Sequence, residues 1–419
     1  MSRWKGPLAL AGARWAWKRY RRQEPPPSPI RQNAELLAWG ATGAALGVGV
    51  SALSERRRAR SMRGKVALVT GGSRGLGLQL AREFGDSGAS VVICARGRED
   101  LDRAVAELTG RGVAAHGVVC DIGDPKAVDA LLDEAVERFG RLDVVVNSAG
   151  IMRVGPQETI ADEDFAQAMD IMFWGPFHLS RAAVERMRGT GGTVVNVTSI
   201  GAYLSVPHML SYSVAKRAWA ALSEGLAAET GGTGVRVLTV VPGLMRTGSH
   251  KGVLFSGDPE REYAWFALAA GLPLLSVSAE RAARGIVRAA ASGRGFLIIT
   301  PATRIGLAVH GVAPGLTQRA LRVVGRLLPR APQIVMERHG SEAADSRIGR
   351  LVDTVGVLND RAGRRLNQPS RGEKGRPRDT GRDTGSKDAA QDPDLAGARV
   401  TEDEGGPAPD GWRGPDGRS

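Results

Sequence analysis

Short apolar runs alternate with segments of helical periodicity between Gly64 and Thr300. The runs expected to be strands span 65–70, 91–94, 114–120, 144–147, 193–198, 235–241 and 296–300. Apolar residues at helical spacing occupy 75–84, 100–108, 125–139, 162–187, 212–229 and 279–291. Near-continuous apolar strands separated by helices predict a parallel sheet that is covered on both faces. With right-handed crossovers, the predicted fold class is α/β, a doubly wound parallel sheet of the Rossmann type.

The segments before this domain, which we place at 62–302, differ from it in composition. Residues 1–33 are basic and contain several tryptophans, and residues 34–54 form an apolar helix. The eighteen residues from Leu36 to Leu53 carry no charge, which is the lower limit for a membrane-spanning helix. We expect this helix to associate with a membrane; the alternative is a loosely packed helix on the surface of the main domain.

Two segments are expected after the main domain. Residues 303–337 combine arginines with leucines and valines at helical spacing, and this extension is predicted to dock either on the domain or on a membrane. Residues 338–419 are predicted to be a polar, largely disordered tail, with weak helical periodicity up to 366. From 367 onward the chain has too few apolar residues to offset the entropy of ordering.

Charge and cysteine content indicate which binding partners and which compartment to expect. The formal net charge is +13, and arginines crowd the amino-terminal arm among its aromatic residues. Basic residues with interfacial aromatics beside an apolar run favour a membrane surface over nucleic acid, so no nucleic-acid partner is expected. Cys94 and Cys120 end apolar runs, which favours a reducing compartment on the cytoplasmic side. They have no metal-ligand spacing with the six histidines, and no metal is assigned.

A glycine-rich loop follows the first predicted strand directly and opens the first helix. Gly71, Gly75 and Gly77 have the spacing Gly-x-x-x-Gly-x-Gly. Glycines here allow a sharp turn and the close approach of a pyrophosphate, whose charge lies at the helix N-terminus. The pattern therefore predicts a dinucleotide site.

The end of the second strand distinguishes the two nicotinamide dinucleotides. An acid there accepts a hydrogen bond from the ribose 2′-hydroxyl of NAD, whereas an arginine accommodates a 2′-phosphate. This chain has Arg96 at that position and no acid before Glu99, and Arg74 lies in the glycine loop. Guanidinium groups suit phosphate oxygens, so NADP(H) is the predicted cofactor.

Candidate acid/base residues follow the fifth strand. Tyr212 and Lys216 stand four residues apart, so on a helix both side chains leave the same face. A neighbouring ammonium favours the phenolate and brings the tyrosine toward useful acid/base strength. Ser199 ends an apolar run, and its hydroxyl is expected to hold a substrate oxygen against Tyr212.

In order and spacing, Ser199 and the Tyr-x-x-x-Lys pair resemble the active-site segment of the short-chain dehydrogenase/reductase family, and the glycine loop resembles the family's cofactor fingerprint. The resemblance covers roughly Gly64 to Thr300. It implies that Tyr212 acts as the general acid, that Ser199 holds the carbonyl oxygen and that Lys216 binds the nicotinamide ribose. Family members are dimers or tetramers, so a homodimer or homotetramer is expected. The implied cofactor contacts are Gly71, Ser73, Arg74, Gly75, Leu76, Gly77, Arg96, Asp121, Ile122, Asn147, Ala149, Gly150, Tyr212, Lys216, Pro242, Gly243, Leu244 and Thr247.

Two features concern the substrate side. Met172 stands where many members of the family have an asparagine that holds a water in the proton relay, and methionine is only a weak acceptor. Phe173 and Trp174 beside it are expected in the core. The segment 248–277 is rich in large apolar residues and follows the sixth strand, so it is expected to cover a lipophilic substrate or to pack on the domain.

These observations lead to one main hypothesis and one alternative. The main hypothesis is an NADP(H)-dependent oxidoreductase of the carbonyl reductase/alcohol dehydrogenase type, which interconverts a lipophilic ketone or aldehyde with an alcohol. The alternative is a membrane-tethered NADP(H)-binding sensor or scaffold with little catalysis, which Met172 and the long flanking segments motivate.

Overall fold

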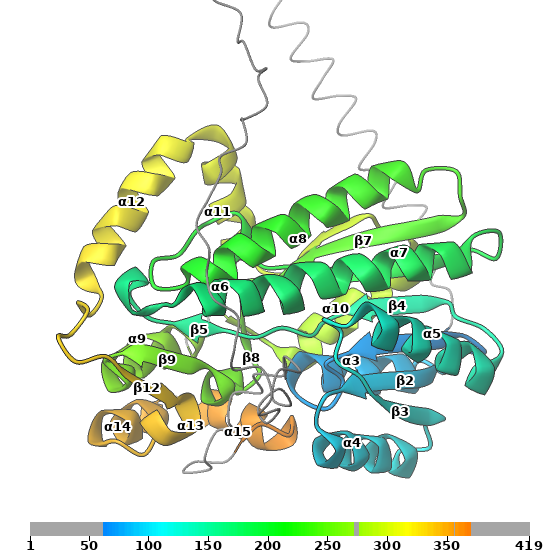
Figure 1. Ribbon diagram of the computed structural model, residues 1–419, viewed down its shortest axis with the longest axis horizontal. Coiled ribbons are helices and arrows are strands. Elements are labelled where there is room, and N and C mark those ends of the chain that lie inside the picture. The colour runs from blue at the N-terminus through cyan, green and yellow to red at the C-terminus, as the bar shows by residue number, and fades with distance from the viewer. Residues whose placement is uncertain (1–61, 272–275, 356, 370–419) are drawn as a thin grey trace, which may run out of the picture. The chain divides into compact units, whose positions relative to one another are not determined.

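Seven parallel strands form the central sheet of the protein (Figure 1). The computed structural model describes residues 62–271, 276–355 and 357–369. The strands are β1 (Val66–Thr70), β2 (Ser90–Ala95), β3 (Ala115–Val119), β4 (Val144–Asn147), β6 (Gly192–Val197), β7 (Val235–Val241) and β11 (Phe296–Ile298). They lie in the order β11-β7-β6-β4-β1-β2-β3. The chain reverses its direction of progress between β1 and β4, and such a switch point opens a crevice at the carboxyl ends of the strands.

The strands form where the apolar runs predicted them. Every residue of β1 is buried, and β2, β4 and β6 are buried along most of their length. Valine and isoleucine dominate these segments, and their branched side chains favour a pleated, covered surface. The edge strand β3 is only half-buried. The predicted α/β class is confirmed.

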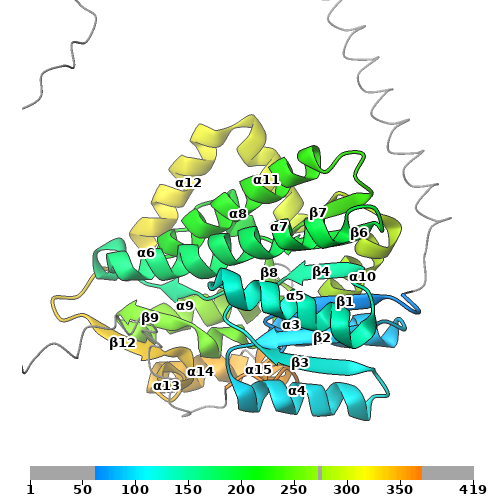
Figure 2. The same ribbon diagram turned by 45° about the vertical axis from the view of Figure 1, so that its right-hand side comes forward.

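Helices cover both faces of the sheet (Figures 1 and 2). On one face lie α3 (Gly75–Asp86), α4 (Arg98–Gly110) and α10 (Ala279–Ser292); on the other lie α5 (Pro125–Phe139), α7 (Gly175–Met187) and α8 (Leu210–Glu229). Phe84 of α3 and Ile286 of α10 belong to the first apolar core. Leu131 of α5, Leu179 of α7 and Trp219 of α8 belong to the second. The sheet is thus buried between two apolar layers.

The helix predicted over 162–187 is interrupted. It consists of α6 (Asp162–Met169), a π-helical turn (Asp170–Trp174) and α7. Met172 lies buried inside that turn, whereas Trp174 is 43% exposed. The expectation that Trp174 belongs to the core is therefore wrong. π-Turns inside helices occur frequently at functional sites.

The described residues continue as ordered elements beyond the expected domain end at 302 and into the segment expected from 338 to be a polar tail. After α11 (Pro301–Val312) and α12 (Pro314–Leu327), the chain returns as β12 (Met336–His339), which pairs with β9 (Leu254–Gly257). It continues as α13 (Gly340–Ala343), α14 (Arg347–Val355) and α15 (Val357–Arg365). Ala343, Ala344 and Val352 are buried against α9 (Pro259–Gly271). Residues up to 369 therefore complete the fold.

Three predicted segments lie outside the described residues: the basic segment 1–33, the apolar helix 34–54 and the end of the tail, 370–419. Within the part of the chain that is described, no helix combines the length and the apolar character that crossing a membrane requires.

Candidate active site

The glycine loop connects β1 to α3 at the switch point of the sheet. Gly71 has a φ of +66°, and a Cβ there would come within 2.9 Å of the Cα of Ala149. A Cβ on Gly77 would come within 2.2 Å of the carbonyl oxygen of Gly71. Gly75, with a φ of +60°, begins α3. Each glycine thus has a separate reason: Gly71 makes a left-handed turn, Gly77 allows a close approach of loop to helix, and Gly75 starts the helix with a positive φ.

Thr70, which begins the glycine fingerprint but was given no role of its own from the sequence, ties the glycine loop to the loop after β4. Its hydroxyl accepts hydrogen bonds from the backbone N–H groups of Ser148 (3.0 Å) and Ala149 (3.1 Å). It also donates to the carbonyl oxygen of Val146 at 3.3 Å. The signal for this role in the sequence was a polar residue at the end of an apolar strand. The two loops that face the crevice are therefore held together by one side chain.

Asn147 was expected to contact the cofactor, but its side chain lies in the interior. Its amide nitrogen donates to Asn196 Oδ1 at 2.8 Å and to Ser180 Oγ at 3.0 Å. Asn196 in turn donates to Ser223 Oγ at 3.0 Å, and the Ser223 and Thr239 hydroxyls are 2.7 Å apart. This buried polar chain joins β4, β6, α8 and β7, and buried polar groups need such partners. The side chain of Asn147 therefore fixes the sheet beneath the site.

Ser199 and Tyr212 lie together as predicted from the sequence. The Ser199 hydroxyl caps a short 3-10 turn by accepting from the N–H of Gly201 at 3.0 Å, and it is hydrogen-bonded to the Tyr212 phenol. A Cβ on Gly201 would lie 3.1 Å from Cε1 of Tyr212 and 3.4 Å from Ser199 Oγ. The absence of a side chain at Gly201 thus lets the serine reach the tyrosine.

Lys216 lies one turn along α8 and is buried. Its Nζ donates to the carbonyl oxygen of Val197 at 2.9 Å and lies 3.8 Å from the centre of the Trp219 ring. Burial lowers the pKa of Lys216 to about 7. Burial also raises the pKa of the Tyr212 phenol, and the hydrogen bond with Ser199 opposes that increase. The net effect on the pKa of Tyr212 is thus an increase, whereas we expected Lys216 to lower it.

Met172 reaches the same place from the π-helical turn. A Cβ on Gly150 would lie 3.5 Å from Met172 Sδ and 3.9 Å from Lys216 Nζ. The methionine is fully buried. An apolar thioether thus stands near the lysine, where the family resemblance led us to expect a polar side chain.

The two arginines of the predicted phosphate site are exposed at the same edge of the sheet. Arg74 immediately precedes α3, and Arg96 follows β2, whose last residues pair with the end of β1. Asp121 is exposed after β3, and its carboxylate accepts from the N–H of Gly123 at 2.9 Å. Ile122 is buried, and a Cβ on Gly175 would lie 3.0 Å from its side chain. Ile122 therefore supports the π-helical turn.

The loop after β7 closes the other side of the crevice. The carbonyl oxygen of Pro242 accepts from the N–H of Ile200 at 2.8 Å, which holds the 3-10 turn that follows Ser199. Gly243 leaves no room for a side chain, because a Cβ there would lie 2.5 Å from Thr303 Oγ1. Leu244 begins β8 (Leu244–Arg246), and Thr247 behind it is buried.

The large apolar residues of 248–277 serve packing more than we expected. Phe255, Tyr263 and Phe266 are buried in one core with the helices that follow β12. Glu262 is fully buried, and its carboxylate accepts from Trp265 Nε1 at 2.7 Å and lies 2.9 Å from His208 Nδ1. His208 has a φ of +65° and stands four residues before Tyr212. This cluster fixes the segment beside the start of α8.

Metal-binding geometry is absent from the part of the chain that the structure describes, where no group of three or more His, Cys, Asp and Glu side chains converges. Cys94 and Cys120 are buried, free thiols.

Comparison with known proteins places these residues in context. A family model described as short chain dehydrogenase matches residues 65–254. A putative ketoacyl reductase of Streptomyces coelicolor is 36% identical over 187 residues, which cover 44% of this chain and 71% of the relative. D-threitol dehydrogenase of Mycolicibacterium smegmatis is 36% identical over 185 residues, which cover 44% of this chain and 71% of that relative. The solved structure of a short-chain dehydrogenase from Streptomyces avermitilis has a TM-score of 0.54 at 31% identity, covering 64% of this chain and 98% of that one.

Proposed function

This chain belongs to the short-chain dehydrogenase/reductase family of nicotinamide-dependent oxidoreductases, and we propose that it is an NADP(H)-dependent enzyme that interconverts a ketone or aldehyde with an alcohol. The observation that carries the proposal is the pairing of Ser199 with Tyr212 at the edge of the sheet where the glycine loop opens. Acid/base chemistry requires two such groups within hydrogen-bond reach of one substrate oxygen.

The residues present fit a bound dinucleotide, because α3 begins at a glycine, its cap residue Arg74 makes no side-chain hydrogen bond to the helix, and backbone N–H groups at such a helix N-terminus suit a phosphate. The nicotinamide would supply or accept the hydride. Ser199 Oγ orients the substrate oxygen by hydrogen bonding. Tyr212 Oη then gives that oxygen a proton during reduction. Burial raises the pKa of the Tyr212 phenol above its ordinary value, so the tyrosine holds the proton that carbonyl reduction consumes.

The direct test removes the phenol oxygen and nothing else. Tyr212→Phe should keep NADPH binding and lose carbonyl reduction by about a hundredfold or more, the usual contribution of a positioned acid. Tyr203→Phe is the matched control, because the Tyr203 hydroxyl bonds to Glu224 instead. A panel of carbonyl compounds read by NADPH absorbance supplies the rates. Turnover in Tyr212→Phe equal to that of Tyr203→Phe would reject the mechanism; no turnover in the wild type would favour the sensor.

The preference for NADP(H) has its own support. Arg74 and Arg96 are exposed at the ends of neighbouring strands, and no acid occurs after β2 before Glu99. Arg96→Ala should raise the KM for NADPH about tenfold, the value of a charge-assisted hydrogen bond, and leave the KM for NADH nearly unchanged. Arg98→Ala is the control, since Arg98 is exposed on α4 and pairs only loosely with Asp102. Equal effects on both cofactors would contradict the assignment.

An apolar substrate is supported by the surroundings of Tyr212. The tyrosine ring packs against an apolar cluster, together with Met152 and Val206, which are themselves partly exposed. A hydroxyl or carbonyl at the reacting end of an otherwise apolar molecule suits this environment. Rates with a series of ketones that differ only in alkyl length should rise with length; a preference for charged or polyhydroxylated carbonyls would contradict the proposal.

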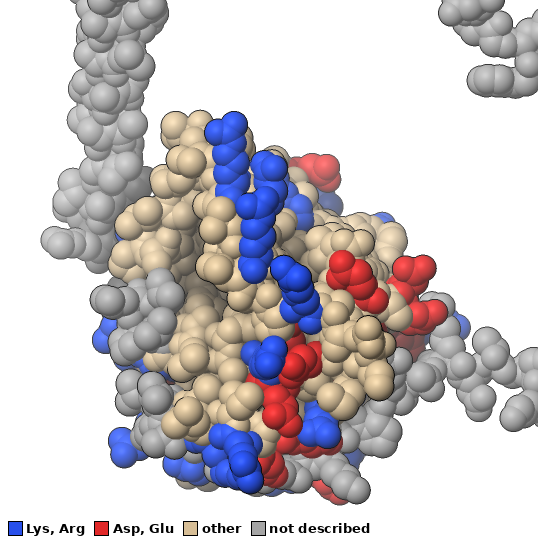
Figure 3. Space-filling view, turned by 90° about the vertical axis from the view of Figure 1, so that its left-hand side faces the viewer, with Lys and Arg blue, Asp and Glu red and all other residues tan. Residues whose placement is uncertain are grey.

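We further propose that the enzyme works at a membrane surface, and α12 supports this. Leu316, Val323 and Leu327 are 60%, 55% and 81% exposed along one side of the helix. Arginines at 319, 322, 326 and 330 are exposed beside them, and Figure 3 shows a row of basic side chains along this ridge. Exposed apolar residues flanked by arginines are typical of helices that lie on anionic lipid.

Vesicle sedimentation tests the membrane proposal. Leu327→Asp should weaken binding to vesicles of phosphatidylserine and phosphatidylcholine by about tenfold, the value of one buried leucine. Leu351→Asp is the matched control, because Leu351 is 71% exposed on α14. If both variants bind vesicles as the wild type does, α12 is not the contact surface.

A homodimer or homotetramer is proposed through α7 and α8. Trp174, which directly precedes α7, and Val214 of α8 are 43% and 44% exposed, and the Trp174 ring contacts those of Phe173 and Phe177. Exposed aromatic clusters mark protein interfaces. Light scattering should show a smaller particle for Trp174→Asp but not for Leu268→Asp, since Leu268 is 43% exposed on α9. An unchanged mass in both variants would place the interface elsewhere.

A further inference from the structure

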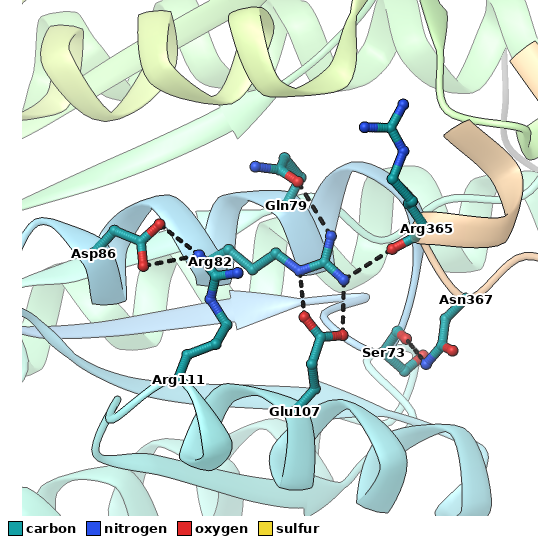
Figure 4. Close-up of polar contacts among 8 residues, drawn as sticks. All are labelled: Ser73, Gln79, Arg82, Asp86, Glu107, Arg111, Arg365 and Asn367. Carbon is teal, nitrogen blue, oxygen red and sulfur yellow. Dashed lines mark hydrogen bonds and ion pairs between the residues drawn. The ribbon is translucent and has the colours of Figure 1, made fainter. Parts of the chain in front are cut away.

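The chain after α14 runs back across the glycine loop. We name residues 357–369, which comprise α15 and the residues after it, the C-terminal strap. The carbonyl oxygen of Arg365 accepts from Arg82 Nη2 at 2.8 Å, and that of Leu366 accepts from the N–H of Gly75 at 2.8 Å. Asn367 Nδ2 donates to the carbonyl oxygen of Ser73 at 3.2 Å. Figure 4 shows the Arg365 contact with Arg82 of α3 and the Asn367 contact with Ser73, which lies just before that helix.

The strap is also fixed to the opposite side of the crevice. Asn359 is buried, and its Oδ1 accepts from the N–H of Gly248 at 3.0 Å while its Nδ2 lies 3.1 Å from His250 Nδ1. A Cβ on Gly248 would come within 2.2 Å of the Cα of Gly363. The strap therefore joins the glycine loop after β1 to the loop that follows β8.

One strap residue lies in the space that the dinucleotide needs. The middle glycine of the loop exists so that backbone and pyrophosphate can approach closely. A Cβ on Gly75 would lie 2.9 Å from Gln368 Nε2; apart from the neighbouring residues and the backbone of α3, no other atom of the described residues lies within 4 Å of that point. The side chain of Gln368 also faces Gly248, where a Cβ would lie 3.4 Å from Gln368 Cγ. Gln368 therefore sits between the two loops.

The docked position is held by apolar burial as well as by hydrogen bonds. Leu366 is fully buried and Ala362 is 6% exposed, and both pack against Ala279 at the start of α10. Arg82, which holds Arg365, is itself fixed by Glu107 through two contacts of 2.7 Å (Figure 4). Residues of α3, α4 and α10 thus form a docking site for the strap.

We propose that the C-terminal strap is an internal competitor of the dinucleotide, which must displace it from the glycine loop in order to bind. The proposal rests on the proposed function only in requiring that a dinucleotide binds this loop. The Leu366 carbonyl oxygen takes the Gly75 N–H at the helix N-terminus, where phosphate oxygens bind. A protein whose binding-competent form is only partly populated binds its ligand more weakly by that fraction. The strap therefore sets the cofactor concentration at which the enzyme becomes active.

The first experiment weakens the strap in the full-length chain and measures NADPH binding by calorimetry. Asn367→Ala/Gln368→Ala removes two half-exposed side chains and should lower the Kd for NADPH about fivefold, the value of one hydrogen bond. Leu366→Asp introduces a charge at a buried position, which should undock the strap and lower the Kd further. Leu351→Ala is the control, because it alters an exposed residue of the preceding helix.

The second experiment needs no variant. Hydrogen exchange of peptides from 357–369 in the wild-type protein should become faster when NADPH is saturating, because bound cofactor holds the strap off the loop. Slower exchange with NADPH would overturn the proposal, since the strap would then close over the cofactor. An equal or higher Kd in both strap variants would overturn it as well and leave the cofactor assignment intact. Absence of NADPH and NADH binding in every variant would reject the cofactor assignment, and the strap proposal with it.

Discussion

Replacing the buried Lys216 by methionine should make the stability of the protein less dependent on pH. Lys216 is 6% exposed, and burial lowers its pKa to about 7 in the folded protein. An unfolded lysine titrates near pH ~10.4. Between these two values the unfolded chain holds a proton on this residue that the folded protein has lost. Stability therefore rises with pH across this window, and the contribution is lost as pH falls through the folded pKa.

The size of the effect follows from the same values. Each pH unit within the window changes the free energy of unfolding by about 1.4 kcal/mol, and the change is smaller close to the pKa of the folded protein. From pH 7 to pH 9 the wild type should therefore gain about 2 kcal/mol in the free energy of unfolding relative to Lys216→Met. Methionine has a similar length and no charge, and it can occupy the space beside Trp219.

Urea unfolding of wild type and variant at pH 7, 8 and 9, without cofactor, measures this difference. Other groups that titrate in the range are common to both proteins and cancel. Lys126→Met, which removes an exposed lysine at the start of α5, should show no such divergence from the wild type. A constant difference between wild type and Lys216→Met over the three pH values would refute the reasoning, because the lysine would then titrate alike in both states.

Three other predictions concern residues that hold the site in place. Thr70→Val removes the acceptor of two backbone N–H groups and should destabilise the protein by about 2 kcal/mol, whereas Thr70→Ser, which keeps the hydroxyl, should cost less in the same urea titration. Arg153→Met removes the guanidinium that lies 2.7 Å from the buried carboxylate of Asp164, so unfolding should require about 3–5 kcal/mol less; an unchanged midpoint would contradict this. Glu262→Gln weakens the contact with His208 and should raise the KM of the carbonyl substrate more than it lowers kcat. A lower kcat with an unchanged KM would indicate a different role.

The sheet was predictable because its strands are short, buried and nearly continuous in apolar residues. A run such as Val66–Thr70 has no polar face to solvate, so only a covered parallel sheet accommodates it. The meeting of Ser199 and Tyr212 followed from the same logic, because a residue at the carboxyl end of a strand and one on the first turn of the next helix share an edge of the sheet.

The carboxyl-terminal third was harder to predict because its packing uses small residues. Ala343, Ala344 and Ala362 are buried there, and Gly363 fits against Gly248 without a side chain on either. Alanine and glycine give no strong apolar periodicity, so the segment resembles a polar tail in sequence. The environment of Lys216 was equally hidden, since the burial that sets its pKa depends on Trp219 and Val197 from two elements.

The N-terminus of α3 explains why two different groups are suited to the same place. Arg74 at its cap position makes no side-chain hydrogen bond to the helix, and the first turn contains no acidic residue. The partial positive charge of the backbone N–H groups there lacks a local acceptor on α3, and such an end favours an anion or a carbonyl oxygen. In this structure the Leu366 carbonyl meets that need at 2.8 Å from the Gly75 nitrogen; a pyrophosphate carries full negative charge and meets it more strongly. The hydrogen bond to a neutral carbonyl thus holds the strap on the loop in the absence of the cofactor, and a charged pyrophosphate can replace it.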